Sequence, residues 1–209
     1  MHPAQGLGPE DGIDRIRSVA SGCRACDLWE RGTQTVFGEG PVTASLMLVG
    51  EQPGDREDVA GRPFVGPAGN LLDEALDEAG VDREQVFVTN AVKHFKWRPS
   101  GKRRLHEKPN AGEIRACRPW LDLELELVRP EILVLMGATA AQAVLGPAFR
   151  ISRDRGVLIP ADSGGPARIA TFHPSAILRA PDSQTRDTYY AALVTDLRTA
   201  GQAAGVLPA

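Results

Sequence analysis

The 209-residue chain has only three cysteines and lacks any long apolar run. An odd number of cysteines argues against the disulfide framework of a small secreted protein. No apolar stretch approaches the roughly 20 residues that cross a bilayer. The N-terminal stretch MHPAQGLGPEDG also lacks the charged-then-apolar pattern of a signal peptide. We therefore expect a cytoplasmic protein that does not enter a membrane.

Internal repeats and a dividing linker are absent as well, so the sequence predicts one domain spanning residues 1–209. Hydrophobic residues make up 42% of the chain, enough to bury a sizeable core. We expect about ten N-terminal and about nine C-terminal residues to fray, as chain ends often do.

Short apolar runs alternate with segments of helical periodicity along the chain. The runs predict buried strands at 45–49, 86–90, 131–137 and 168–172. The periodic segments predict helices at 14–20, 70–79, 113–128, 138–145 and 187–200. Residues 51–69 are rich in glycine and proline and indicate a long loop. This alternation predicts the α/β class, as a three-layer α/β/α sandwich around a mostly parallel four-stranded sheet.

Charge is distributed unevenly, although the net charge is only -3. From Lys93 to Arg118 the chain has nine Lys or Arg residues and two acids, so this segment carries +7 and the rest -10. At its centre lies GKRRLHEKP, residues 101–109, with one histidine among the cations. Concentrated positive charge suggests a polyanionic partner, because neutralising phosphates releases counterions. A solvated basic loop is the alternative for such a run taken alone.

Polar motifs follow several of the predicted strands at their carboxyl ends. GEQPGD follows the first strand, TN ends the second, and HPS follows the fourth, while the basic loop also comes after the second strand. In open parallel sheets, binding sites form beyond the carboxyl ends of the strands. We therefore treat these segments as parts of one site.

Together these motifs resemble the iron–sulfur branch of the uracil-DNA glycosylase superfamily. The matching segments are GEQPG at 50–54, HPS at 173–175, the C-x-x-C at 23–26 and VTNAVKH at 88–94. Gln52 and the KRRLH segment at 102–106 are similar to the UdgX-type sub-branch, whose loop reads K-R-R-I-H, with Leu105 in place of isoleucine. The resemblance implies a protein that excises uracil from DNA and becomes covalently attached through the loop histidine, with close to one turnover per molecule.

For the base itself, the resemblance implies that Phe64 stacks on uracil, Asn90 pairs with uracil O4 and N3–H, and His173 donates to O2. Gln52 is expected to orient the loop or the sugar, and Asp58 to make a further polar contact near the base. From the residues alone, Phe64 could fill the core, Asn90 could form a turn, and His173 could be structural.

For the chemistry, the resemblance implies that His106 attacks C1′ of the sugar while Glu51 holds the other ring N–H. In an unrelated protein His106 would be an exposed loop histidine. The residues expected to contact DNA are Lys102, Arg103, Arg104 and Ser175, and the three cations could instead brace the loop.

Cys23, Cys26 and Cys117 leave a four-coordinate metal site one ligand short. The iron–sulfur glycosylases carry a cysteine just after the TN strand, and His94 stands at the matching position. Histidine replaces cysteine on iron in some clusters. We therefore expect a [4Fe–4S] cluster on Cys23, Cys26, His94 and Cys117. Zinc suits three sulfurs and one nitrogen as well, and unligated thiols are a third reading.

The expected partner is uracil-containing DNA, bound by a monomer. The sequence leaves open whether duplex DNA is bound as well as single-stranded DNA. Two alternatives remain at this stage: an ordinary glycosylase that uses water and turns over repeatedly, and a non-catalytic nucleic-acid-binding module that carries a cluster.

Overall fold

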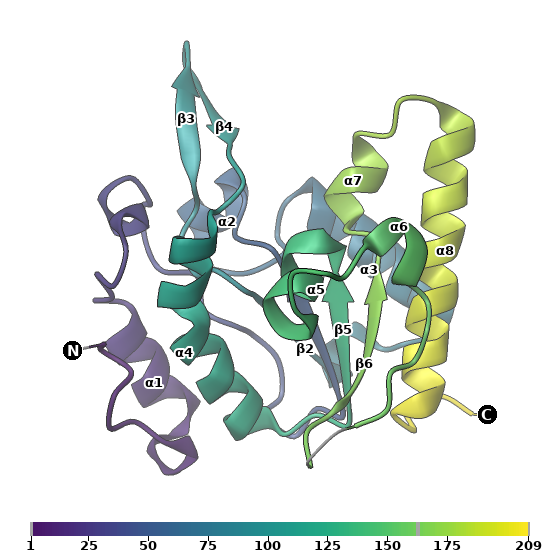
Figure 1. Cartoon of the computed structure of the whole chain (residues 1–209), viewed down its shortest axis with the longest axis horizontal. Coiled ribbons are helices and arrows are strands. Elements are labelled where there is room, and N and C mark those ends of the chain that lie inside the picture. Colours follow the sequence, from purple (N-terminus) through teal and green to yellow (C-terminus); the bar gives the residue numbers. More distant parts are fainter. Residues whose placement is uncertain (1, 162–163, 209) are drawn as a thin grey trace.

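A central sheet of four parallel strands runs through the computed structural model, which describes residues 2–161 and 164–208 (Figure 1). The strands lie in the order β2-β1-β5-β6. Their bounds are β1 Leu46–Gly50, β2 Val86–Asn90, β5 Ile132–Met136 and β6 Ala167–Thr171. Each neighbouring pair is parallel. The predicted α/β/α sandwich around a four-stranded parallel sheet is therefore confirmed.

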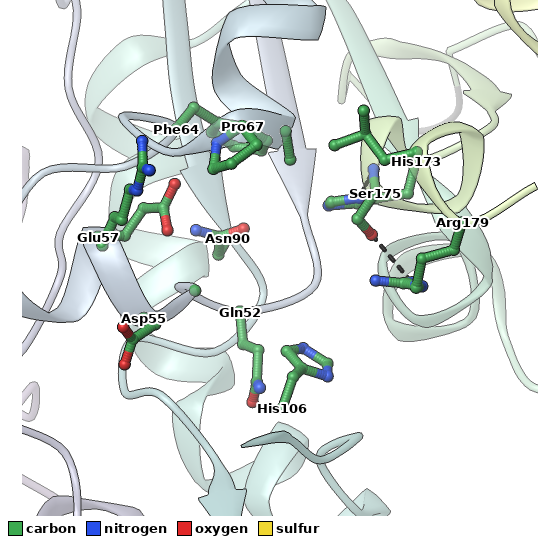
Figure 2. Close-up of a pocket in the computed structure, with 14 residues that line it drawn as sticks. Gln52, Asp55, Glu57, Phe64, Pro67, Asn90, His106, His173, Ser175 and Arg179 are labelled. Carbon is green, nitrogen blue, oxygen red and sulfur yellow. Dashed lines mark hydrogen bonds between the residues drawn. The ribbon is translucent and has the colours of Figure 1, made fainter. Parts of the chain in front are cut away.

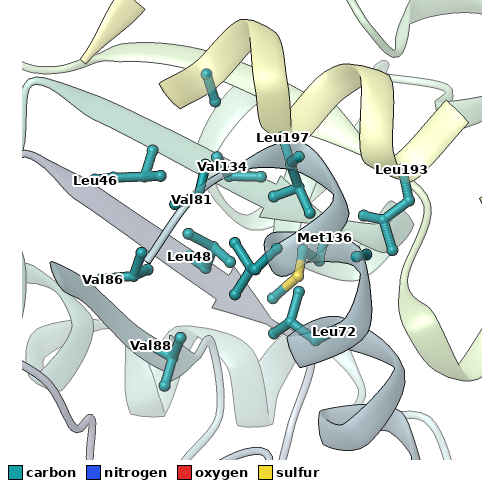
Figure 3. Packing of buried hydrophobic residues seen from close by; sticks show 14 of the residues in the cluster. Leu46, Leu48, Leu72, Val81, Val86, Val88, Val134, Met136, Leu193 and Leu197 are labelled. Carbon is teal, nitrogen blue, oxygen red and sulfur yellow. The ribbon is translucent and has the colours of Figure 1, made fainter. Parts of the chain in front are cut away.

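Both faces of the sheet are covered, which explains why the strands are mostly apolar and do not alternate with polar residues. Leu46 and Leu48 point to one hydrophobic cluster, whereas Met47 and Val49 point to the other. Figure 3 shows the first cluster, where strand residues such as Leu48 pack against Leu72 and Leu197 of the covering helices. The core thus holds the strand ends rigidly for the site above them.

The first face is covered by α3 (Pro67–Ala79), α7 (Pro174–Leu178) and α8 (Ser183–Ala203). α3 begins with proline at its first position and ends at Gly80, whose φ of 85° suits a left-handed helix end. These caps place the start of α3 next to the end of β1, where the site lies.

The second face is covered by α4 (Ala111–Val128) and α5 (Gly137–Leu145), and α1 (Gly12–Ala20) packs outside α4. α4 begins with a capping box in which Asn110 and Glu113 bond to each other's main chain. The remaining helical elements are α2 (Asp55–Ala60), α6 (Ile151–Asp154) and the 3-10 turns Pro9–Asp11, Asp27–Glu30 and Arg83–Gln85. Within the described ranges, no helix is long and apolar enough to cross a membrane.

The basic segment is not a loop, as the sequence suggested, but a β-hairpin. It consists of β3 (Trp97–Ser100) and β4 (Arg103–His106), which pair antiparallel and project above the sheet (Figure 1). Gly101 takes a φ of 58° in the turn between them. Because most residues of both strands are exposed, they show no apolar alternation that would mark them as strands.

One further expectation differs from the structure. Residues 51–69, expected to form a loop, contain the short helix α2, whose first turn carries acids that suit a helix N-terminus. Near the chain ends, His2 packs against Trp120 with ring centroids 5.4 Å apart, and Leu207 packs against the main core cluster.

Candidate active site

The carboxyl ends of β1, β2 and β6 converge on a cavity of about 360 Å³ (Figure 2). Six of the residues singled out from the sequence line it: Gln52, Phe64, Asn90, His106, His173 and Ser175. They come from four separate segments of the chain. The expectation that the polar motifs form one site is therefore met by the geometry.

Gly50, the last residue of β1, is the point on which three of these groups converge. A Cβ atom built on Gly50 would lie 2.4 Å from Asn90 Oδ1, 2.8 Å from Phe64 Cζ and 3.3 Å from His173 Nε2. Any side chain at this position would displace them. The glycine therefore lets an amide, an aromatic edge and an imidazole nitrogen approach one another closely.

Phe64 forms one wall of the cavity. Its ring is 8% exposed and lies 6.1 Å from the His173 ring, with 29° between the planes. The backbone of Phe64 has a left-handed φ of 56°, and a Cβ on Gly69 would approach the Phe64 carbonyl oxygen to 1.7 Å. The close passage of α3 at Gly69 thus supports a strained residue that presents a flat apolar surface.

Asn90 ends β2 and is 3% exposed. Its Oδ1 is buried and has no hydrogen-bond partner among the described residues. Buried amide oxygens are rarely left unpaired, and each such case calls for an explanation. A ligand that donates a hydrogen bond into the cavity would supply the partner.

His173 lies at the start of α7 and is held in one tautomer. Its Nδ1 accepts a hydrogen bond from the Ser175 main-chain N–H at 3.1 Å. Burial lowers the pKa of His173 to about 4, so the ring is neutral at physiological pH. Since Nδ1 accepts, the single ring proton is on Nε2, which is the atom near Gly50. His173 therefore offers a neutral donor to the cavity.

His106 reaches the cavity from the hairpin, on the side opposite Phe64 and Pro67 (Figure 2). Its Nε2 lies 3.3 Å from Glu51 Oε1, and the Thr139 hydroxyl donates to the other carboxylate oxygen. Burial by itself raises the pKa of the Glu51 carboxyl, but these two hydrogen bonds lower it below its ordinary value. Glu51 is therefore an ionised partner for the imidazole.

A second cavity of about 270 Å³ adjoins the first and includes Glu51 and Thr139 in its lining. His106, His173 and Gln52 line both cavities. The imidazole of His106 thus stands at the boundary between the base-sized pocket and the carboxylate.

Gln52 holds the base of the hairpin. Its Nε2 donates to the carbonyl oxygens of Lys96 and Glu107, both at 3.1 Å, and its Oε1 accepts from the Lys96 N–H at 3.2 Å. Lys96 precedes β3 and Glu107 follows β4, so one side chain is bonded to both ends of the hairpin. Gln52 therefore positions the segment that carries His106.

Arg104 holds the hairpin from its outer side. Its guanidinium forms ion pairs with Asp55 at 2.5 Å and Asp58 at 2.6 Å. Asp58 is fully buried, also accepts from the main chain and hydroxyl of Thr33, and does not line the cavity. The structure thus gives no support to the expected contact between Asp58 and a base. The two ion pairs of Arg104 brace the hairpin. Lys102 and Arg103 are exposed at the hairpin tip.

The lining residues that were not singled out from the sequence include Glu57 and Arg179. Glu57 is 7% exposed in the wall of the cavity, and its Oε1 accepts from the Gly66 N–H at 2.7 Å. Glycines at positions 54 and 66 leave room for this carboxylate. These two glycines on either side of Glu57 are the feature of the sequence that could have indicated its place in the site. Arg179 lines both cavities and donates to the Ser175 hydroxyl at 3.1 Å (Figure 2).

The cysteines gather away from the cavity, beside α4. Cys23 and Cys117 are buried in one hydrophobic cluster, and Cys26 packs against it. Trp120 Nε1–H donates to the Cys23 sulfur at 3.2 Å, and the Lys93 main-chain N–H donates to the Cys117 sulfur at 3.1 Å. Burial raises the pKa of the Cys117 thiol to about 12.

The fourth expected ligand, His94, is buried, and its Nε2 lies 3.1 Å from the Thr35 hydroxyl oxygen. Within residues 2–161 and 164–208, no group of three or more His, Cys, Asp or Glu side chains is arranged to hold a metal ion. The three sulfurs thus share one neighbourhood, and those of Cys23 and Cys117 accept the N–H···S bonds common at thiolate-bound metals. A ligand set around a centre remains a prediction.

Comparison with known proteins adds to this geometry. Residues 37–198 match the model of the uracil DNA glycosylase superfamily. A type-4 uracil-DNA glycosylase of Thermotoga maritima is 41% identical over 179 residues, which cover 85% of this chain and 88% of that protein. One from Archaeoglobus fulgidus is 38% identical over 84% of this chain and 86% of its own length. For one from Sulfurisphaera tokodaii, 43% identity extends over 61% of this chain and 55% of that protein. The chain belongs to the uracil-DNA glycosylase superfamily.

Proposed function

We propose that this protein excises uracil from DNA and then becomes covalently attached to the resulting sugar through His106. The observation that carries the proposal is the position of the His106 ring, which lines the base-sized cavity and has the ionised Glu51 carboxylate 3.3 Å behind it. The superfamily match and the type-4 relatives support the substrate.

Uracil must leave the base stack to enter such a cavity. Phe64 would stack on the base, and the unpartnered Asn90 Oδ1 would accept its N3–H, while the Asn90 amide N–H would donate to O4. The Nε2–H of neutral His173 would donate to O2. The buried Glu57 carboxylate forms part of the wall around the base.

The first step breaks the bond between C1′ and N1, and its electron pair leaves with N1. The negative charge spreads to O2, where the His173 donor stabilises it. The sugar is left with oxocarbenium character at C1′. Because the neutral His173 ring accepts at Nδ1, its one N–H is on Nε2 and is available to donate this hydrogen bond.

The second step joins the imidazole to the sugar. The ring nitrogen that does not face Glu51 supplies its lone pair to C1′, and the ring becomes cationic. In the present orientation Nε2 faces Glu51, so the nitrogen that supplies the lone pair is Nδ1. Glu51 keeps the remaining N–H and balances the new positive charge. No further reactant is needed, and the uracil anion takes a proton from solvent.

The adduct should persist because hydrolysis requires water to displace the imidazole at a position that the ring itself occupies. Turnover is therefore expected to stay near one per protein molecule. Lys102, Arg103 and Ser175 would contact phosphates, and the exposed hairpin tip suits the first two for that role.

For the cysteine group we propose a [4Fe–4S] cluster held by Cys23, Cys26, His94 and Cys117, with zinc as the alternative. The donor types fit, and the Trp120 and Lys93 N–H groups already point at two of the sulfurs. A metal there would neutralise thiolates that burial otherwise disfavours, and it would tie the end of α1 to α4. We assign it a structural role, and no step of the reaction passes through it.

The decisive experiment is mass spectrometry after exposure to a single-stranded oligonucleotide with one deoxyuridine. We expect the mass of protein plus oligonucleotide minus uracil, with the attachment mapped to His106. A matched oligonucleotide with deoxycytidine should give no adduct. Attachment at another residue would refute the assigned nucleophile. Free uracil far in excess of protein would favour an ordinary multiple-turnover glycosylase, and an unchanged oligonucleotide would favour a binding module without catalysis.

A further inference from the structure

A fully buried ion pair is bonded to the main chain of Asn90, which lines the cavity. Lys93 Nζ is 2.6 Å from Glu124 Oε2, and the two side chains are 1% and 0% exposed. Removing two charges from water is unfavourable, and replacing such a pair by apolar residues is often neutral or stabilising. Fold stability alone therefore does not account for the pair.

The polar groups around this pair satisfy one another. The ammonium group of Lys93 donates to Glu124, to the Thr89 hydroxyl at 2.6 Å and to the Asn90 carbonyl oxygen at 2.7 Å, which uses all three of its protons. The Glu124 carboxylate also accepts from Thr89 and from the Gly38 main-chain N–H at 2.8 Å. Such a network has one low-energy arrangement, so it is rigid.

The rigid network is bonded to the residue that faces the base. Lys93 holds the carbonyl of Asn90, and the next two N–H groups, of Ala91 and Val92, donate to the carbonyls of Gly50 and Glu51 at 2.9 and 3.0 Å. The Asn90 main chain is therefore held on both sides. Its Oδ1, by contrast, has no partner among the described residues. The direction of that oxygen thus depends on the main chain from which it extends.

We propose that Lys93 and Glu124 are positioning residues that fix Asn90 so that its amide reads uracil and rejects cytosine. This inference rests on the proposed function of the pocket. Uracil presents a donor at N3 and an acceptor at O4, whereas cytosine presents the reverse pattern. An amide held in one orientation matches only the uracil pattern. An amide that is less firmly held can rotate by about 180° and match the cytosine pattern. The ion pair is thus a determinant of specificity that does not touch the base.

The test removes both charges together, in the variant Lys93→Met/Glu124→Gln. The glutamine still offers an acceptor to Gly38 and Thr89, and no unpaired charge is left buried. The control variant Arg118→Met/Asp122→Asn removes the partly exposed ion pair of the same helix, whose side chains are 39% and 44% exposed. Thr89→Val, which removes only the hydroxyl between the two charges, is a second test variant that preserves shape.

Each protein, in excess, is mixed with single-stranded oligonucleotides that contain one deoxyuridine or one deoxycytidine. Base release is counted as free base, and thermal unfolding and iron content are measured on the same samples. In the charge-free variant we expect uracil release to slow by about ten- to a hundredfold, the equivalent of one or two well-placed hydrogen bonds. Its preference for uracil over cytosine should also fall. In the Thr89→Val variant, the rate of uracil release and the preference for uracil should both fall by smaller amounts. Both quantities in the control variant should match those of the wild type.

A merely structural pair would lower the folded fraction without changing the ratio of the uracil rate to the cytosine rate. Unchanged rates and an unchanged ratio in folded charge-free protein would overturn the inference, as would a loss that follows iron content. Should that variant not fold, an unchanged ratio in Thr89→Val overturns it equally. A wild-type protein that releases no base from either oligonucleotide would overturn the proposed function and this inference with it.

Discussion

The neutrality of His173 makes a quantitative prediction about stability and pH. Burial lowers the pKa of the ring from 6.5 to about 4 in the folded protein. The folded value lies below the unfolded one, so the unfolded chain binds more protons between the two. The contribution of the neutral ring to the free energy of unfolding is therefore fully present above about pH 6.5 and is lost as the pH falls toward 4.

The size of this loss follows from the two pKa values. Between pH 7 and pH 4.5, the wild type should lose about 2 kcal/mol through His173 alone. The variant His173→Gln keeps a polar amide but has no ring to titrate, so it should lose that much less over the same interval. Losses from carboxylates elsewhere are common to both proteins and cancel in the comparison.

Urea unfolding at the two pH values, for both proteins, measures the difference directly. An equal loss of stability in wild type and variant would refute the reasoning. It would mean that the ring is solvated or already protonated near neutrality. The proposed role as a neutral donor to uracil O2 would then fail as well.

Three further changes test the remaining parts of the site. His106→Ala should abolish the adduct on a denaturing gel while free uracil is still released, because Phe64, Asn90 and His173 are untouched; a persisting adduct would contradict this. Gln52→Ala removes the bonds at the base of the hairpin, and two net hydrogen bonds correspond to about thirtyfold faster amide exchange there; unchanged protection would show that the hairpin is held elsewhere. Arg104→Ala leaves the buried Asp58 without its counter-charge and should destabilise the fold by about 2–3 kcal/mol in urea, and a loss below about 0.5 kcal/mol, typical of an exposed pair, would contradict that.

The strands of the sheet could be predicted from the sequence because they are buried on both faces. Each strand is mostly apolar, and each predicted boundary lies within one residue of the observed one. Prediction failed for α2, a six-residue helix with four charged residues and no apolar stripe. Prediction from the sequence also failed for the hairpin. Its strands are mostly exposed, so no buried face produces an alternation of apolar and polar residues. Elements that lack a core-facing side leave no periodic signal.

The site residues also divide into those that the sequence predicts and those that it does not. Those on the recognised motifs meet in the cavity because strand ends in a parallel sheet meet at one edge. Asp58 was expected to contact the base, but its partners, Thr33 and Arg104, are distant in sequence. The Lys93–Glu124 pair spans 31 positions and becomes visible only when α4 packs against the end of β2. Long-range polar pairs of this kind cannot be read from local pattern.

The arrangement of Glu51 and Gln52 explains how a nucleophile on a projecting hairpin can be aimed. Glu51 faces the His106 ring, and Gln52, the next residue, bonds to the main chain at both ends of the hairpin that carries it. Both side chains leave the same turn, directly after β1, which the core holds in place. A shift of the hairpin relative to the carboxylate would therefore have to break the Gln52 bonds first. One strand end thus fixes the distance between nucleophile and counter-charge, although the hairpin itself has little buried surface of its own.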